Sequence, residues 1–126
     1  MKIAIIIVRL LLGALFVFGA VVYFFHIPME EPAMSVDQKT FMSGVMASVY
    51  LFPLIKATEL ICGLALVIGR FVPLAVVVIF PVTLNIFLYH AFLGPKDLPM
   101  AVILLLANLF LAYAYRKNYT TLLVAK

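Results

Sequence analysis

Four apolar stretches, separated by short polar segments, organise this chain of 126 residues. As α-helices with a rise of about 1.5 Å per residue, they reach or approach the roughly 30 Å needed to cross a hydrocarbon core. We place these spans at residues 3–25, 53–68, 71–93 and 100–115. No connection is long enough to separate domains, so we expect one all-α domain over residues 1–126. It would fold as an antiparallel bundle of four transmembrane helices.

The segment between the first two spans predicts one further, shorter helix. Residues 26–32 contain two prolines and two acids (Glu30 and Glu31), which end the first helix. Ser35 and Gln38 then have the spacing of a capping box. Apolar residues follow at helical spacing, at Phe41, Val45, Val49 and Phe52. We therefore expect an amphipathic helix that lies in the membrane interface or caps the bundle.

The composition supports a membrane protein and excludes several other classes. Hydrophobic residues make up 67% of the chain and charged residues only 11%, far from the values of soluble domains. The net charge of +4 does not indicate a nucleic-acid partner, because the basic residues lie at the ends of the spans. Cys62 is the only cysteine, which excludes an internal disulfide and a CxxC redox pair.

The distribution of lysine and arginine predicts the orientation. The side with both termini and the Gly69-Arg70 turn carries most of the bases: Lys2, Arg9, Arg70, Arg116, Lys117 and Lys126. The opposite side carries two bases and four acids: Lys39, Lys96, Glu30, Glu31, Asp37 and Asp97. Because positive charge favours the cytoplasmic side, we expect an inner (plasma) membrane protein with both termini in the cytoplasm.

Six polar side chains inside the spans or at their edges are the candidate ligand-binding residues. They are Arg9, Lys56, Glu59, Asn85, His90 and Asn108. At about 1.5 Å per residue, Arg9 lies roughly 9 Å from the cytoplasmic edge, Asn108 roughly 12 Å and Glu59 roughly 15 Å. These three side chains are therefore expected to meet. Lys56 and Asn85 lie roughly 20 Å deep and His90 higher still, while Lys56 is also close enough to Glu59 to pair directly.

Two interpretations of this cluster remain open. An ionisable residue inside a membrane is costly, which favours a role in ligand binding. A buried Arg9–Glu59 pair supported by Asn108 would equally serve to fix how the helices pack. His90 is more typical of a hydrogen-bonding histidine than of a metal ligand, and we assign no metal site and no catalytic residue.

Several short motifs, in order along nearly the whole chain, resemble the DoxX-like family of small four-helix membrane proteins. They are Arg9-x-x-x-Gly13-x-x-Phe16, Glu59-x-x-x-Gly63, residues 69–75 (GRFVPLA), residues 85–90 and residues 113–119. The family name comes from a subunit of an archaeal thiosulfate:quinone oxidoreductase. The resemblance therefore implies a link to membrane quinones, although membership in a family does not by itself confer an activity.

The leading functional hypothesis is an accessory membrane protein that binds a quinone-like or lipid-like molecule at the polar cluster. The lipid bilayer is its expected surrounding, and a membrane redox complex or a second copy is a candidate partner. We do not expect an enzyme by itself, because the chain has no redox cysteine pair and no cofactor motif. The alternatives are a structural or assembly subunit and a small proton-coupled transporter that uses Glu59. The transporter ranks last because no inverted repeat is apparent.

Overall fold

A computed structural model describes residues 1–29, 33–94 and 97–125 of the chain. Its elements are α1 (Lys2–Phe24), α2 (Val36–Ala47), α3 (Leu51–Ile68), α4 (Val72–Phe92), α5 (Leu98–Ala114) and the short 3-10 helix η2 (Arg116–Tyr119). Within these ranges all regular structure is helical, so the all-α prediction is confirmed. The predictions for Glu30, Glu31, Pro32, Pro95, Lys96 and Lys126 lie outside the described residues.

Three of the helices are long and apolar enough to cross a membrane. They are α1, α3 and α4, and their ends lie within two residues of the predicted spans. Helix α5 is equally apolar but has only 17 residues, or about 26 Å of helix. The structure thus gives three candidate spans and a shorter apolar helix, and the fourth span stays a prediction.

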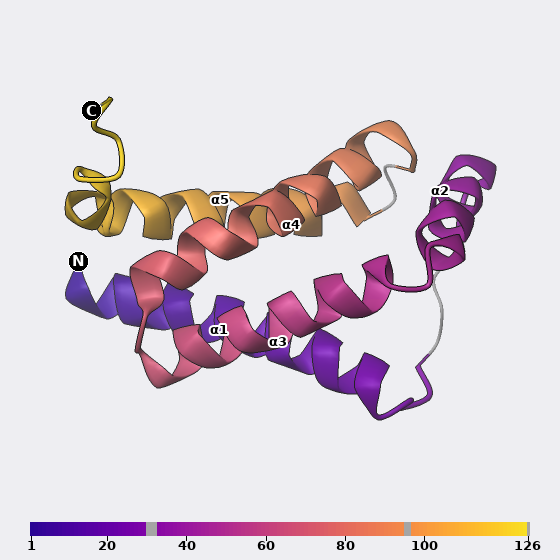
Figure 1. Cartoon of the computed structure of the whole chain (residues 1–126), viewed down its shortest axis with the longest axis horizontal. Helices are drawn as coiled ribbons and strands as arrows, with labels where there is room; N and C mark the ends of the chain where they lie inside the picture. The colour runs from indigo at the N-terminus through magenta and orange to yellow at the C-terminus, as the bar shows by residue number, and fades with distance from the viewer. Residues whose placement is uncertain (30–32, 95–96, 126) are drawn as a thin grey trace.

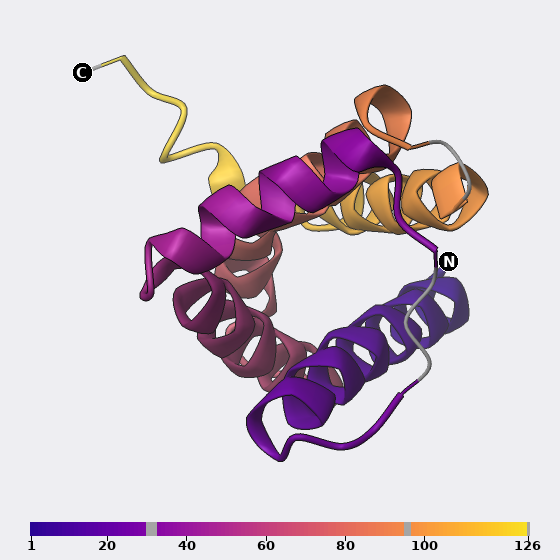
Figure 2. The ribbon, with the colours of Figure 1, turned by 90° about the vertical axis from the view of Figure 1, so that its right-hand side faces the viewer.

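The helices pack as two pairs, α1 with α3 and α4 with α5, which are joined by contacts between α3 and α4 (Figure 1). The two pairs lie close together at one end and separate toward the other (Figure 1). We call the first the terminal end, because the start of α1, the α3–α4 turn and η2 all lie there. Helix α2 crosses the other end, here called the α2 end (Figure 2).

The core is apolar and receives side chains from four helices. Its fully or almost fully buried members include Leu12, Leu66, Val76, Ile79 and Leu111. Many other large apolar side chains are exposed along the outer faces of the same helices. An apolar surface of this extent suits contact with lipid rather than with water.

Two glycines set the close contact between α1 and α3. A Cβ atom on Gly13 would lie 2.8 Å from the backbone oxygen of Gly63, and one on Gly63 would lie 2.9 Å from the oxygen of Gly13. Phe16 and Ala20, which follow Gly13 at helical spacing, are buried as well. The close approach of the two helices depends on glycine, because glycine has no side chain.

The predicted capping box at the start of α2 is present and also ties this helix to the α4–α5 turn. The Ser35 hydroxyl accepts a hydrogen bond from the Gln38 amide N–H, and the Gln38 carboxamide oxygen accepts one from the Ser35 N–H. Ser35 also donates to the Leu93 carbonyl at 2.5 Å, and Gln38 donates to the Gly94 carbonyl at 3.3 Å. The α2 helix is therefore held across the bundle by polar contacts.

The predicted apolar stripe of α2 is wrong in part. Val45 is buried as expected, but Phe41 is exposed and the second buried residue is the polar Gln38. Val49 lies beyond the end of α2 with a φ of +70°, where the chain turns into α3, and its side chain is exposed. Hydrogen bonds to a distant turn, rather than apolar periodicity, decide which face of α2 is buried.

Candidate functional site

Lys56 and Glu59 form an ion pair within α3. The Lys56 ammonium nitrogen lies 3.2 Å from Oε2 of Glu59, and the two side chains are 20% and 7% exposed. The residues are three positions apart, so the pair forms along one helix. Glu59 lies eight residues, or about 12 Å, from the start of α3 at the α2 end. The pair is thus an ionic group inside an apolar helix, as the sequence predicts.

The neighbours of this pair come from α1 and from the preceding turns of α3. A Cβ atom on Gly19 would lie 3.8 Å from the Lys56 ammonium and 3.9 Å from the Glu59 carboxylate, so this glycine faces both charges. One turn further along α1, the Tyr23 ring lies 5.0 Å from the Phe52 ring, measured between centroids. The Lys56 ammonium lies 5.3 Å from the centroid of the same Phe52 ring. Two aromatic rings and a glycine therefore flank the ion pair.

This arrangement offers a hydrogen-bond donor and an acceptor side by side. A lysine ammonium has three N–H donors, and one ion-pair contact leaves others for a ligand. An ionised carboxylate accepts hydrogen bonds at both oxygens, and only Oε2 of Glu59 faces Lys56. A phenyl ring near a cation adds an attraction of about 0.5–2 kcal/mol to that side of the site. Such a set can bind a small polar headgroup that has both a carbonyl and a hydroxyl group.

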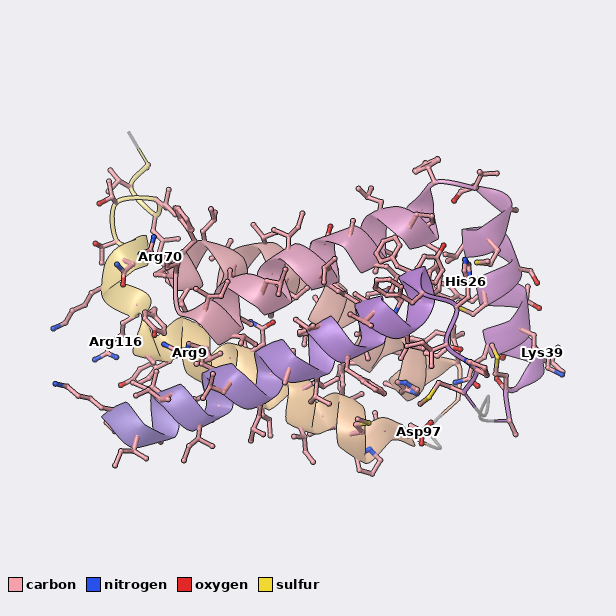
Figure 3. The ribbon with its side chains drawn as sticks, turned by 90° about the horizontal axis from the view of Figure 1, so that it is seen from below. Arg9, His26, Lys39, Arg70, Asp97 and Arg116 are labelled. Atoms are coloured by element: carbon pink, nitrogen blue, oxygen red, sulfur yellow. The ribbon has the colours of Figure 1, made fainter. Side chains whose placement is uncertain are left out.

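The structure corrects the expected meeting of Arg9 with Glu59. A Cβ atom on Gly69 would lie 3.0 Å from the Arg9 guanidinium, which places that group at the α3–α4 turn, about ten residues of α3 away from Glu59. Arg9 lies with Arg70 and Arg116 at the terminal end (Figure 3). The depth estimates counted backbone positions only, but side chains lean toward the N-terminus of their own helix. In antiparallel α1 and α3 the two side chains therefore extend in opposite directions.

Asn108 joins two other helices instead of the ion pair. Its side-chain nitrogen donates to the carbonyl of Val76 at 3.3 Å, which ties α5 to α4. The side chain is fully buried, and within the described part of the chain its oxygen has no hydrogen-bond partner. Asn108 is therefore a packing contact between helices, separate from Lys56 and Glu59.

Asn85 and His90 lie on α4, a different helix from the ion pair. The Asn85 side chain is exposed. The His90 ring packs edge-on against the Tyr89 ring, which in turn lies 5.4 Å from Phe41 of α2, measured between centroids. The Nδ1 atom of His90 is buried without a hydrogen-bond partner among the described residues. Of the six candidate residues, the structure brings together Lys56 and Glu59.

Gly19, Tyr23 and Phe52 are the site neighbours that the sequence analysis missed. A usable signal exists in their spacing. Gly19 and Tyr23 are four residues apart on α1, and Phe52 precedes Lys56 by the same interval on α3, so each pair shares one helix face. With eleven phenylalanines and six tyrosines in the chain, spacing alone does not tell which aromatic rings lie beside the charges.

A match to a protein-family model extends from α1 into α4. No curated protein and no solved structure matches the chain. The family model described as DoxX matches residues 4–91, a range that includes the Gly13–Gly63 contact and the Lys56–Glu59 pair. Because the match covers more than half of the 126 residues, the chain belongs to the DoxX family.

Proposed function

We propose that this DoxX-family protein binds a small amphiphilic molecule, of quinone or lipid type, at the Lys56–Glu59 pair. In this proposal α1, α3, α4 and α5 all span the inner (plasma) membrane, with both termini in the cytoplasm. The protein acts as an accessory component that delivers or holds the molecule for a membrane redox complex.

The observation that carries the proposal is that the ion pair lies within one helix. A charge pair that fixes helix packing has to join two helices, as the Asn108–Val76 contact does. Lys56 and Glu59 are both on α3, and the α1 residue that faces both charges is Gly19, which has no side chain to bond to them. Burying charge inside a membrane costs several kcal/mol, and the pair does not offset this cost by linking two helices. Binding of a ligand would account for the presence of the pair.

The chemistry of the pair favours a headgroup with both a carbonyl and a hydroxyl group. Lys56 can donate to a carbonyl oxygen, and Glu59 can accept from a hydroxyl group. A quinone presents carbonyls and its reduced form presents hydroxyls, while a lipid such as a monoacylglycerol presents both. The rings of Tyr23 and Phe52 offer flat apolar surfaces to a ring or to the first carbons of a tail.

The placement of the pair supports access from the bilayer. Glu59 lies in the half of α3 toward the α2 end, where the α1–α3 pair separates from the α4–α5 pair (Figure 1). In this proposal, a lipid-like molecule diffusing in the membrane reaches the pair from the α2 half of α3.

The test is mass spectrometry of the small molecules that co-purify with the protein and with two variants. Glu59→Gln keeps the size of the side chain and removes its charge. Thr58→Val is the matched control, because Thr58 lies beside Glu59 in the sequence and its hydroxyl donates to the Leu54 carbonyl of its own helix. The buried Cys62 thiol reports folding, since a thiol-reactive dye labels it only when the helices open.

A molecule retained by the wild type and by Thr58→Val, and lost from Glu59→Gln with Cys62 still protected, is the expected result. Adding a short-chain benzoquinone or a monoacylglycerol to the stripped protein would then distinguish the two ligand types. If Glu59→Gln stays folded and retains the same molecules as the control, the pair is not the binding site. If Glu59→Gln instead exposes Cys62, the pair stabilises the fold and the proposal is wrong.

A further inference from the structure

The Arg9 guanidinium is a cation without an anionic partner in the described part of the chain. Its Nε atom is buried and has no hydrogen-bond partner there, and the ion pair found among those residues joins Lys56 to Glu59. Arginine is not deprotonated in proteins, so the charge persists. Charged groups in membrane helices pair with acids or carbonyls, or extend to the headgroup layer. Within residues 1–29, 33–94 and 97–125 no acid pairs with Arg9, so the guanidinium is open to an anion from outside.

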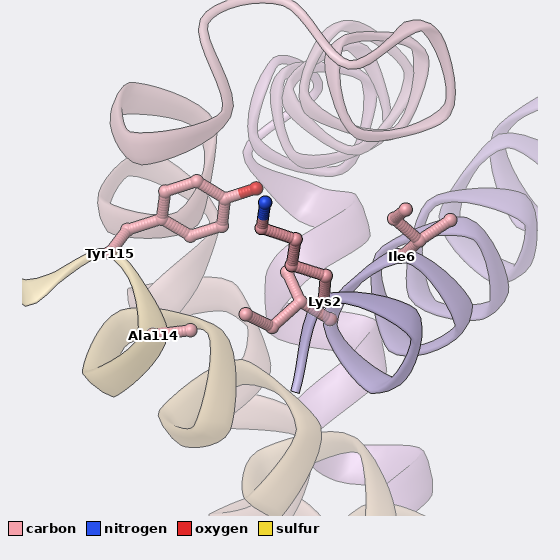
Figure 4. A pocket seen from close by; sticks show the side chains of 5 residues that line it. Lys2, Ile6, Ala114 and Tyr115 are labelled. Carbon is pink, nitrogen blue, oxygen red and sulfur yellow. The ribbon is translucent and has the colours of Figure 1, made fainter.

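A cleft opens on the same face of α1, between its first turns and the end of α5. It has a volume of about 230 Å³ and is lined by Lys2, Ile5, Ile6, Ala114 and Tyr115. In this cleft the Lys2 ammonium points toward the Tyr115 hydroxyl (Figure 4). Arg9 follows Lys2 by seven residues, two turns along that face. The cleft thus has apolar walls, with a cation at its rim and a second cation deeper on the same helix.

The surroundings of this cleft are positive. Arg70 and Arg116 lie at the terminal end with Arg9 (Figure 3). Among the described residues the acids outside the ion pair, Asp37 and Asp97, belong to the α2 end, where Figure 3 shows Asp97. Anionic headgroups are attracted to such a region by about 1 kcal/mol for each basic residue near the surface.

We propose that the terminal end binds an anionic phospholipid in this cleft. The phosphate lies between the Lys2 ammonium and the Arg9 guanidinium, whose paired N–H groups match phosphate oxygens. The Tyr115 hydroxyl is placed to donate to the same headgroup. The acyl chain follows the apolar wall of Ile5 and Ile6 into the membrane. The apolar wall of Ile5 and Ile6 lies beside the two cations and gives an acyl chain a surface to pack on. This combination fits a lipid phosphate better than a free phosphate ion, which has no apolar part. The site is separate from the Lys56–Glu59 pair, and neither proposal depends on the other.

The experiment is a titration of delipidated, detergent-purified protein with phosphatidylglycerol, with phosphatidylcholine as the neutral-headgroup reference, followed by native mass spectrometry. The variants are Arg9→Gln and Lys2→Gln. Arg116→Gln is the matched control, because it removes one charge at the same end. The Arg116 guanidinium bonds to the Tyr113 carbonyl at 2.9 Å and lies over the Tyr113 ring, outside the cleft lining.

Phosphatidylglycerol should bind the wild type and Arg116→Gln in preference to phosphatidylcholine. Arg9→Gln should weaken phosphatidylglycerol binding about tenfold or more, as expected for one charge-assisted hydrogen bond, and Lys2→Gln should weaken it in the same direction. Equal losses in Arg9→Gln and Arg116→Gln would mean general charge attraction and would overturn the proposal. Displacement of the lipid by millimolar inorganic phosphate would identify a free-phosphate site and would also overturn it. If Arg9→Gln does not fold, the comparison of Lys2→Gln with Arg116→Gln decides the question.

Discussion

Replacing Gly13 with alanine should open the contact between α1 and α3. The new Cβ would lie 2.8 Å from the Gly63 oxygen and 2.9 Å from the Leu66 Cβ, both fixed by the backbone of α3. Ordinary contact begins near 3.4 Å, so the helices must separate by about 0.6 Å locally. A gap of that size removes roughly a quarter to a half of the dispersion energy of the atom pairs it separates. Overpacking of this kind costs about 1–3 kcal/mol.

Alanine also stabilises a helix relative to glycine, by up to about 1 kcal/mol, and a control has to separate this effect. Gly44 provides it, because it lies inside α2 and a Cβ there meets no atom within 4 Å. Gly44→Ala should therefore keep or raise stability. Gly13→Ala should lower it, which places the two variants about 1–3 kcal/mol apart.

The assay is labelling of Cys62 by a fluorogenic maleimide during heating in detergent. Cys62 is the only cysteine of the chain, is 4% exposed and precedes Gly63 directly, so it reports on the α1–α3 contact. Gly63→Ala should lower the midpoint as Gly13→Ala does. The double variant should lose less than the sum, because the first alanine already separates the helices. Equal midpoints for Gly13→Ala and Gly44→Ala would refute the tight contact.

Three other changes test the polar contacts between elements. Asn108→Leu should alter the unfolding free energy by less than about 1 kcal/mol in the Cys62 assay. The lost bond to Val76 is offset by the removal of a buried oxygen that has no partner in the described part of the chain. A loss above 3 kcal/mol would contradict this. Gly94→Ala would place a Cβ 2.5 Å from the Gln38 carboxamide carbon, where it disturbs the contact between Gln38 and the turn. Hydrogen exchange in α2 should therefore become faster. Unchanged exchange would show that the turn adapts to the new Cβ. Tyr119→Phe should cost about 1 kcal/mol, because the Tyr119 hydroxyl donates at 2.8 Å to a backbone carbonyl of α4. Burial, and to a lesser extent the neighbouring Tyr115, raise the pKa of Tyr119. The stability that its protonated hydroxyl contributes is therefore complete below the unfolded pKa of about 10. This stability is lost as pH rises through the higher folded pKa. A variant with the same alkaline stability profile as the wild type would contradict this.

The helices were predictable because their signals are local. Long apolar runs, the Ser35–Gln38 capping box and the glycine at position 69 each depend on residues within a few positions of one another. Gly69 ends α3 with a φ of +85°, a conformation that glycine adopts without strain. The Lys56–Glu59 pair was predictable for the same reason, since three positions on one helix always place two side chains together.

The contacts that sequence analysis missed join residues far apart in the chain. The burial of Gln38 depends on a carbonyl 56 residues away, and no periodicity within α2 contains that information. The position of Arg9 depends on the direction in which its side chain leans, which a count of backbone positions leaves out. Counting positions gives the depth of an α-carbon, and a long side chain can lie more than a turn away from it.

The polar groups of the protein form two sets, which differ in the property that their removal should change. Asn108, Gln38 and Tyr119 each bond to a carbonyl of another element, so their removal acts on how the elements are held together. Lys56 and Glu59 bond to each other within one helix, and the Arg9 Nε has no partner among the described residues. A polar group inside a membrane helix is costly when it does not connect two elements, and such a group is expected to serve a function. Variants of the first group should therefore act on stability and leave bound molecules in place. The expected readouts are α2 exchange for the Gln38 contact, alkaline stability for Tyr119, and a change of less than about 1 kcal/mol in the Cys62 assay for Asn108. Variants of the second group should lose bound molecules while the thiol stays protected. A protein in which both groups changed only stability would have no ligand site at either position.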